Sequence, residues 1–183
     1  MNIFRQHHEF LKTEGDILLK NARLGDAHAL LRLQQLPAFA APDNTAPADT
    51  LQLKNALHVI ALENGYPSWN ELKAALDSAA ESSPLAVPGE AFYPKGYTTY
   101  WNIWFAKYSQ AKKVLDEGKG YLLPYKHQYF IVEEHFVDSI GIPHTMPEWE
   151  AIGRDWVHPR RVKEWLRLNS VYERAVDARR EKG

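Results

Sequence analysis

The chain of 183 residues contains no cysteine. Disulfides, thiolate metal sites and cysteine nucleophiles are therefore excluded. No apolar run approaches the ~20 residues that a membrane-spanning helix needs. The first residues, MNIFRQHHEF, also lack an apolar signal core. We therefore expect a cytoplasmic protein without membrane attachment.

An excess of basic residues is missing as well. Lys plus Arg number 22 and Asp plus Glu number 23, a net charge of −1, whereas nucleic-acid-binding proteins generally carry a basic excess. The charge is unevenly spread: residues 1–90 carry −4, residues 91–150 carry −1 and residues 151–183 carry +4. The acidic front and the basic tail could attract each other within one chain or between chains, which leaves a homo-oligomer open. Apolar residues at 45% and charged residues at 25% exclude a disordered chain.

Residues 1–80 carry the pattern of a small bundle of four short amphipathic helices. Gly25 suits a left-handed helix end, and Asp26 suits the N-cap of the next helix. Residues 38–50 are typical of a loop, and Gly65 is expected to end the third helix. Ser68-Trp-Asn-Glu71 fits a capping box at the start of the fourth. The predicted buried face of the first helix consists of Phe10, Leu11, Ile17, Leu18 and Ala22.

The segment from Asn55 to Lys73, NALHVIALENGYPSWNELK, resembles a helix–Gly–aromatic–x–Ser–Trp–x–x–Leu–Lys segment of many bacterial proteins, which often lies beside ankyrin repeats or glyoxalase-like domains. The stretch from Leu11 to Pro37 is similar to the region that precedes it there. The resemblance covers roughly residues 8–77 and implies a helical accessory module that carries no chemistry. The second half resembles only uncharacterised bacterial proteins.

Residues 81–96 hold three prolines and two glycines and are predicted to form a linker. A long amphipathic helix is expected next, with one face formed by Trp101, Trp104, Phe105, Tyr108, Ala111 and Leu115. The stretch 121–126 is too short for a helix and predicts an edge strand or extended loop. We expect another helix over 129–140, a second capping box at 145–148, and a last helix opened by Pro159.

The sequence therefore predicts a mainly α fold. It consists of a helical bundle at 1–80, the linker at 81–96 and an aromatic-rich helical unit at 97–183. This second unit has at most one short strand or hairpin, near residues 121–130.

Four of the six tryptophans lie within residues 97–158. Aromatic side chains line both cores and pockets, so this group is interpreted as the core of the second unit or, alternatively, as the wall of an aromatic cleft. In the second interpretation Arg154 would hold an anion and histidines would supply polar contacts. The candidate ligand-binding residues are Trp101, Trp104, Tyr108, Tyr125, Lys126, His127, His135 and Arg154.

A metal site is not expected, because no pair of histidines has ligand spacing. The second half does contain His127, His135, His144 and His158, with Glu133, Glu134, Asp138 and Glu148 nearby. Glu134 and Asp138 stand at i, i+4 and could share a proton if they were desolvated, but a solvated face is the expected arrangement. No cofactor is predicted.

Other catalytic patterns are incomplete. Asp155 and His158 could pair across a tight turn, but the serines nearest to them lack a nucleophile elbow; these are Ser109, Ser139 and Ser170. Gly118-Lys-Gly120 follows a helix, the reverse of a phosphate-binding loop. A serine hydrolase and a nucleotide-binding protein are therefore disfavoured.

These observations favour a bacterial binding or interaction module without catalysis of its own, whose partner is an unknown protein or a small ligand. The first alternative is a small-ligand-binding protein or enzyme that uses an aromatic cleft in residues 97–158. The second is a weak nucleic-acid contact through the basic C-terminal helix, in which acidic residues are interleaved.

Overall fold

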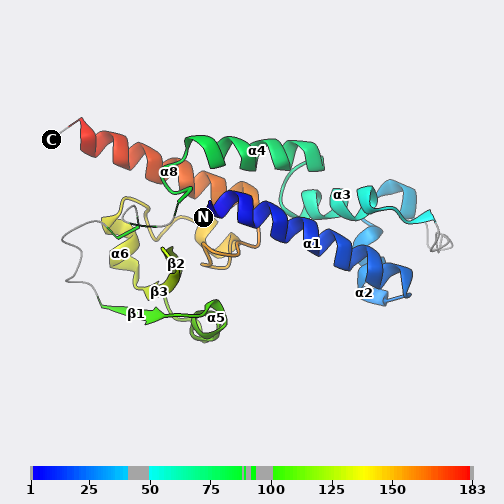
Figure 1. Cartoon of the computed structure of the whole chain (residues 1–183), viewed down its shortest axis with the longest axis horizontal. Coiled ribbons are helices and arrows are strands. Elements are labelled where there is room, and N and C mark those ends of the chain that lie inside the picture. The colour runs from blue at the N-terminus through cyan, green and yellow to red at the C-terminus, as the bar shows by residue number, and fades with distance from the viewer. Residues whose placement is uncertain (1, 41–49, 88, 90–91, 94–100, 182–183) are drawn as a thin grey trace. The chain divides into compact units, whose positions relative to one another are not determined.

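The computed structural model describes residues 2–40, 50–87, 89, 92–93 and 101–181 (Figure 1). Most of the loop predicted at 38–50 and part of the predicted linker lie outside these residues. The helices are α1 (Ile3–Arg23), α2 (Ala27–Leu33), the short 3-10 helix η1 (Pro37–Phe39), α3 (Leu53–Glu63), α4 (Trp69–Ser82), α5 (Tyr108–Asp116), α6 (Glu134–Ser139), α7 (Glu148–Ala151) and α8 (Val162–Arg180).

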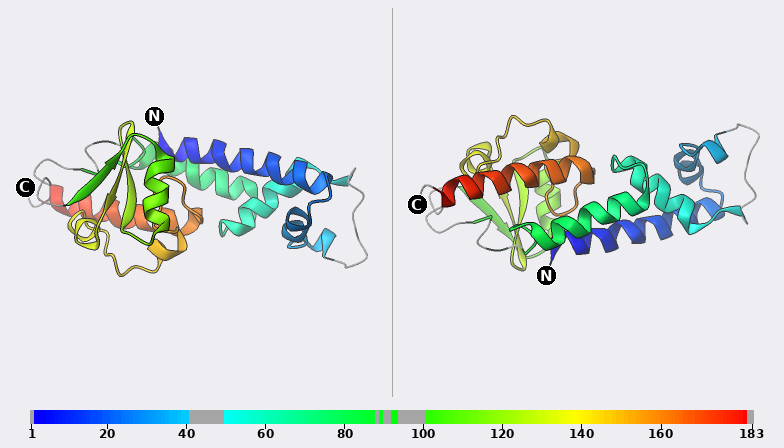
Figure 2. Two further views of the ribbon diagram at one scale, coloured as in Figure 1. Left: turned by 90° about the horizontal axis from the view of Figure 1, so that it is seen from below. Right: turned by 90° about the horizontal axis from the view of Figure 1, so that it is seen from above.

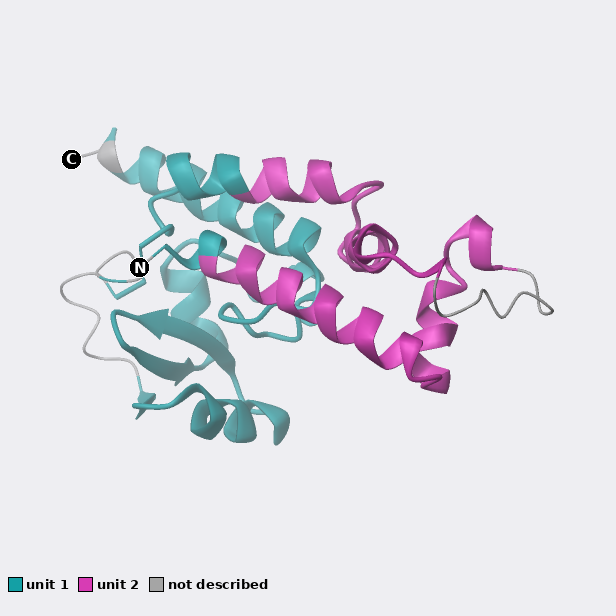
Figure 3. Cartoon of the chain, turned by 45° about the vertical axis from the view of Figure 1, so that its right-hand side comes forward, with its two compact units in different colours: residues 1–5, 77–183 teal, residues 6–76 magenta. Residues whose placement is uncertain are grey.

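The chain divides into two compact units (Figure 3). Unit 1 comprises residues 1–5 and 77–183, and unit 2 comprises residues 6–76. Within the predicted linker at 81–96, the described residues include Leu85 and Phe92, both fully buried. Each unit is described separately below.

Unit 2 is helical, and its helix ends follow the sequence signals. Gly25 and Gly65 both adopt positive φ, at 81° and 83°, the left-handed conformation that glycine adopts without steric cost. The Asp26 carboxylate accepts a hydrogen bond of 2.8 Å from the amide of Ala29, as expected of an N-cap. Ser68 accepts from the amide of Glu71 at 3.2 Å. These predicted caps are confirmed.

The buried face of α1 is narrower than predicted. Leu11, Leu18 and Ala22 are buried, but Phe10 and Ile17 are exposed. The reason is helical geometry: Phe10 and Ile17 lie seven residues apart on one stripe, turned away from the stripe that Leu11 and Leu18 share.

Unit 1 contains a three-stranded antiparallel sheet, so the mainly α prediction with at most one hairpin is wrong. The protein has a mixed α/β fold that is mainly helical with a small sheet. The strands are β1 (Asn102–Phe105), β2 (Tyr121–Tyr125) and β3 (Gln128–Val132), and β3 lies between the other two. β2 and β3 form a hairpin whose loop is Lys126 and His127, since Tyr125 pairs with Gln128.

The two faces of the sheet carry different side chains because side chains alternate along a strand. On one face, Ile103, Leu122 and Ile131 pack with Ala111 and Leu115 of α5. Figure 2 shows α5 alongside the three strands. On the other face, Trp104 stacks on Phe130, with ring centroids 4.7 Å apart, and Phe130 meets Phe136 of α6.

Two predicted helices are therefore partly strands. The helix expected over 101–115 is β1 followed by α5, and the helix expected over 129–140 is β3 followed by α6. Short runs of aromatic and β-branched residues satisfy a helical period and an alternating period equally well. Pairing with a distant strand decides between them, and local spacing contains no information about that pairing. Of the edge strand and the extended loop that were predicted as alternatives for 121–126, the structure shows the edge strand, β2.

The core around α7 and α8 is built from tryptophans. Trp149, Trp156 and Trp165 are fully buried and contact one another, with ring centroids 5.5 Å and 6.2 Å apart along the series. α7 starts at Glu148 with Pro147 as its N-cap and no side-chain cap, so the predicted capping box at Thr145 does not form. The last helix starts at Val162, three residues after Pro159.

Candidate functional site

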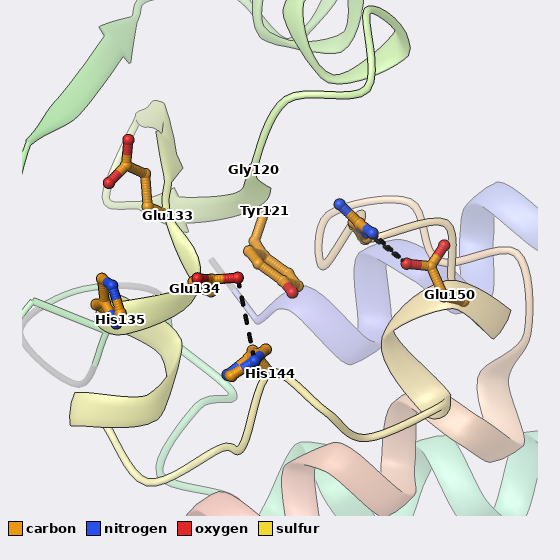
Figure 4. A pocket seen from close by; sticks show the side chains of 8 residues that line it. Gly120, Tyr121, Glu133, Glu134, His135, His144 and Glu150 are labelled. Atoms are coloured by element: carbon orange, nitrogen blue, oxygen red, sulfur yellow. Dashed lines mark hydrogen bonds and ion pairs between the residues drawn. The ribbon is translucent and has the colours of Figure 1, made fainter.

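A polar pocket of about 480 Å³ lies in unit 1, beside the start of β2 (Figure 4). Five parts of unit 1 contribute to it: the entrance to β2, the first turn of α6, the loop after α6, the helix α7 and the turn after α7. We call it the His144 pocket. Its lining residues are Gly120, Tyr121, Glu133, Glu134, His135, His144, Glu150 and Arg154.

His144 is held in place by Asp138. The carboxylate of Asp138 accepts from the backbone amide of His144 at 2.7 Å and contacts its ring Nδ1 at 2.8 Å. Burial raises the pKa of Asp138. The hydrogen bonds from the backbone amide and the ring of His144 outweigh this effect, and the charges of His144 and His135 lower the pKa further when these rings are protonated, so the pKa lies below its ordinary value. An ionised Asp138 is an acceptor and therefore assigns the hydrogen of a neutral ring to Nδ1. Nε2 is then left as an acceptor.

That Nε2 atom faces Glu134. Nε2 lies 4.0 Å from Oε2 of Glu134, beyond hydrogen-bond distance. Figure 4 shows Glu134 and His144 pointing toward each other, with Tyr121 beside them, while Glu133 points away. When the His144 ring is neutral, the pocket therefore brings two acceptors close together without a donor between them.

Tyr121 supplies a third polar group. Only 6% of this residue is exposed, and within the described residues its hydroxyl has no hydrogen-bond partner. Burial raises the pKa of the Tyr121 hydroxyl; Arg154 opposes this, whereas the carboxylates of Glu134, Glu150 and Asp138 reinforce it. Because this hydroxyl lines the pocket and has no partner among the described residues, it is suited to a hydrogen bond with an incoming group.

The far wall is formed by Arg154 and Glu150. Nε of Arg154 donates to Glu150 at 2.7 Å, and the guanidinium lies 5.4 Å from the centre of the Tyr121 ring. Gly153 and Arg154 both have positive φ, at 72° and 53°. Arginine in this conformation costs about 1–2 kcal/mol.

This turn is bonded to the sheet. The carbonyl of Arg154 accepts from the amide of Leu122 at 2.9 Å, and the carbonyl of Leu122 accepts from the amide of Trp156 at 3.0 Å. Asp155 thereby forms a parallel bridge with Leu122. The strained turn is thus fixed to β2 and positions Arg154 at the pocket, where Arg154 donates to Glu150 of α7.

The pocket is acidic. Glu133, Glu134 and Glu150 line it and Asp138 lies behind His144, against the single guanidinium of Arg154; with a neutral His144, four negative charges and one positive charge leave −3. Within the described part of the chain, no three His, Asp or Glu side chains are arranged to hold a metal ion. The chemistry available is hydrogen bonding and charge, centred on His144, Glu134 and Tyr121.

Two of the predicted ligand-binding residues, His135 and Arg154, line this pocket. Tyr125, Lys126 and His127 lie instead at the β2–β3 hairpin, where the Lys126 ammonium lies 5.2 Å from the Tyr125 ring. Trp104 packs against Tyr125, with ring centroids 5.5 Å apart. The structure therefore does not gather all eight residues into one aromatic cleft.

The remaining two predicted residues lie elsewhere. Trp101 is 70% exposed. Tyr108 donates from its hydroxyl to Asp155 at 2.6 Å, and Asp155 also accepts from the backbone amide of His158. Asp155 is 3% exposed, and burial together with the charge of Asp155 raises the pKa of Tyr108. Asp155 thus contacts His158 through the backbone of a turn.

Sequence reasoning missed Tyr121 as a site residue and did not join His144 to Asp138. The one available signal was the carboxylate pair Glu134 and Asp138 with a histidine six residues farther on. Helical spacing rules find partners within one helix, whereas His144 returns to α6 from the loop after it.

Arginines of α8 take part in contacts within unit 1. Arg161 pairs with Glu164 at 3.1 Å, and Nη2 of Arg179 donates to the carbonyl of Ile140 at 2.5 Å. Arg167 lies 3.8 Å from Glu148. The predicted nucleic-acid contact through this helix stays a prediction.

A scan against protein-family models, a search of curated proteins and a search of solved structures each find no match to this chain. The resemblance of residues 8–77 to a bacterial accessory module thus stays an expectation. Among the helices that the structure describes, none combines the length and apolar character that crossing a membrane requires.

Proposed function

We propose that this protein is a binding protein and that the His144 pocket of unit 1 holds a small polar molecule. The observation that carries the proposal is the meeting of Tyr121, Glu134 and His144 at one pocket. Tyr121 is a buried residue whose hydroxyl has no hydrogen-bond partner among the described residues. A ligand that hydrogen-bonds this hydroxyl displaces no partner within the described part of the chain.

The proposal joins two of the sequence-based hypotheses. It keeps a binding role without requiring catalysis, and it replaces the aromatic cleft with a polar pocket. The geometry around His144 supports it, because Asp138 fixes the ring through two contacts at 2.7 Å and 2.8 Å. A group oriented before its ligand arrives loses less entropy on binding.

The test is a screen of small polar fragments against the full chain, followed by amide chemical shifts in nuclear magnetic resonance spectra. We expect fragments that shift the amides of Gly120, Tyr121 and Arg154. Tyr121→Phe should lower the affinity for those fragments by about 3–10-fold, the value of one neutral hydrogen bond.

Tyr125→Phe is the matched control, since Tyr125 lies on the same strand but outside the pocket. It should leave fragment affinity unchanged. A screen in which no fragment shifts the pocket amides, or in which both variants weaken binding equally, would overturn the proposal.

A further inference from the structure

We infer that the ligand of the His144 pocket is a small organic cation, an ammonium or a guanidinium, and that it competes with a proton for His144. This inference rests on the proposed function and specifies the chemical class of the ligand. It is carried by the convergence of Glu134, His144 and Tyr121, three groups that can all accept a hydrogen bond from one donor.

The first step is that, with His144 neutral, no hydrogen-bond donor of the described residues lies between Glu134 and His144. Asp138 occupies Nδ1 of His144 at 2.8 Å, so Nε2 of the neutral ring presents a lone pair toward the Glu134 carboxylate. The nearby cation, Arg154, is bonded to Glu150 at 2.7 Å. Within the described residues, no Lys or Arg forms an ion pair with Glu134. An anion and a lone pair therefore face each other without a positive group between them.

The second step is the fit of an ammonium group. Nε2 of His144 and Oε2 of Glu134 are 4.0 Å apart. A nitrogen placed about 2.9 Å from both atoms, the usual hydrogen-bond length, would see them at an angle of about 90°. That angle is about 20° smaller than the tetrahedral angle between two N–H bonds, a difference that bends each hydrogen bond by only about 10°. The third N–H bond is then available to the oxygen of Tyr121.

The third step is the overall charge of the pocket. With His144 neutral, the surrounding groups sum to −3. The Glu134 side chain is 54% exposed and lies beside the buried Tyr121, so its attraction for a cation is that of a partly exposed charge. A negatively charged ligand would meet repulsion from Glu134.

The fourth step is competition with the proton. A proton on Nε2 supplies the positive charge that Glu134 lacks and removes the acceptor that the ligand uses. The charged or titratable groups around His144 are Glu134 and Asp138 of α6, Tyr121 of β2, and Glu150 with Arg154 beyond the tyrosine; His135 also lies near Asp138. By linkage, protonation of His144 weakens cation binding by the same factor by which the bound cation weakens proton binding at His144. The bound cation must therefore shift the titration of His144 to lower pH.

The experiment uses three probes of matched shape: n-butylammonium, n-butanol and butyrate. Their affinities for the full chain are measured from amide shifts at about pH 8 and about pH 5.5, a range that brackets histidine protonation but leaves the amine charged. We expect n-butylammonium to bind more tightly than the other two probes at the higher pH. Its affinity should fall about tenfold or more at the lower pH, and its binding should shift the ring titration of His144 to lower pH. Butyrate should not bind.

Two pairs of variants make the test specific. Glu134→Gln should weaken the binding of n-butylammonium by about tenfold, the value of a charged hydrogen bond. Glu117→Gln, at an exposed carboxylate that does not line the pocket, should change this affinity less than about twofold. His144→Gln should abolish the pH dependence, and His127→Gln at the hairpin should keep it. The backbone amide spectrum of each variant shows whether the substitution has altered the fold.

The outcomes separate the two proposals. If n-butanol or butyrate binds the pocket as well as n-butylammonium, the pocket is a binding site but the cation inference is wrong. If n-butylammonium binds equally at both pH values, the competition with the proton is wrong. If the fragment screen finds nothing at the pocket, the proposed function itself fails.

Discussion

Lys126 adopts a backbone conformation that suits glycine better. It is the first residue of the two-residue hairpin loop and has φ of 52°, whereas His127 is not among the residues with positive φ. Positive φ at the first loop position is the pattern of a type II′ turn, in which glycine is preferred.

We therefore predict that Lys126→Gly raises the free energy of unfolding by about 0.5 kcal/mol. The relief of about 1 kcal/mol or more of backbone strain exceeds the added flexibility of the unfolded chain and the loss of an exposed contact with Tyr125. His127→Gly should lower stability instead. Urea denaturation of the three proteins checks this, and the same sign for both variants would contradict it.

Two tyrosines in unit 1 differ in what their hydroxyls do. The hydroxyl of Tyr108 donates to the buried Asp155 at 2.6 Å, whereas that of Tyr121 has no partner in the part of the chain that the structure describes. Removing the first leaves a buried carboxylate short of a donor, and removing the second leaves nothing unpaired.

Tyr108→Phe is accordingly predicted to cost about 1–3 kcal/mol of stability, while Tyr121→Phe should leave stability unchanged or slightly higher. Thermal unfolding followed by circular dichroism measures both. Equal losses in the two variants would mean that the tyrosine rings, and not the hydroxyls, determine the effect.

At the scale of elements, the start of β2 depends on Gly120. Gly118 and Gly120 both have positive φ. A Cβ atom on Gly120 would overlap the backbone carbonyl oxygen of Val132 in β3, whereas one on Gly118 would meet open space. The two positions share a conformational requirement and differ in the close approach of a neighbouring strand.

Gly118→Ala is predicted to cost about 1 kcal/mol, the penalty of the left-handed conformation alone. Gly120→Ala should cost at least about 2 kcal/mol more, because β3 must move to make room. It should also disturb the His144 pocket, which Gly120 lines. Denaturant midpoints and the amide shifts of Val132 report these effects, and equal costs for the two alanine variants would refute the role of the close approach.

How far the sequence predicts these elements depends on the kind of signal. Caps at Gly25, Asp26 and Ser68 depend on residues within four positions, and they were predicted correctly. β1 and β3 pair across more than twenty residues, and their aromatic runs fit both a helix and a strand. The pocket shows the same division. His135 and Arg154 were identified by residue type, whereas the contact of His144 with Asp138 depends on how the loop after α6 folds back, which local spacing does not reveal.

At the scale of the whole molecule, pH is expected to act through His158. Burial lowers the pKa of His158, against an opposing effect of the Asp155 charge. The unfolded chain then binds a proton more readily than the folded protein. The contribution of a neutral His158 is therefore complete above the unfolded pKa of about 6.5, and it is lost as pH falls from there through the lower folded value.

We predict that the free energy of unfolding decreases between about pH 7 and pH 5 and that His158→Gln makes this decrease shallower. The comparison concerns slopes, so a loss of stability common to all pH values does not obscure it. His127→Gln, at an exposed position of the hairpin, should retain the slope of the natural protein. Urea titrations across the range supply the data, and an unchanged slope in His158→Gln would exclude this histidine as the cause.

The hydrogen bond from the Leu122 amide to the Arg154 carbonyl can be followed by hydrogen exchange. The amide hydrogen of Leu122 is buried in the sheet and points to the carbonyl of the strained turn. Its exchange with deuterium from the solvent requires that this turn separate from β2. The exchange rate of this single amide therefore measures how often the wall behind Arg154 opens, before any ligand has been identified.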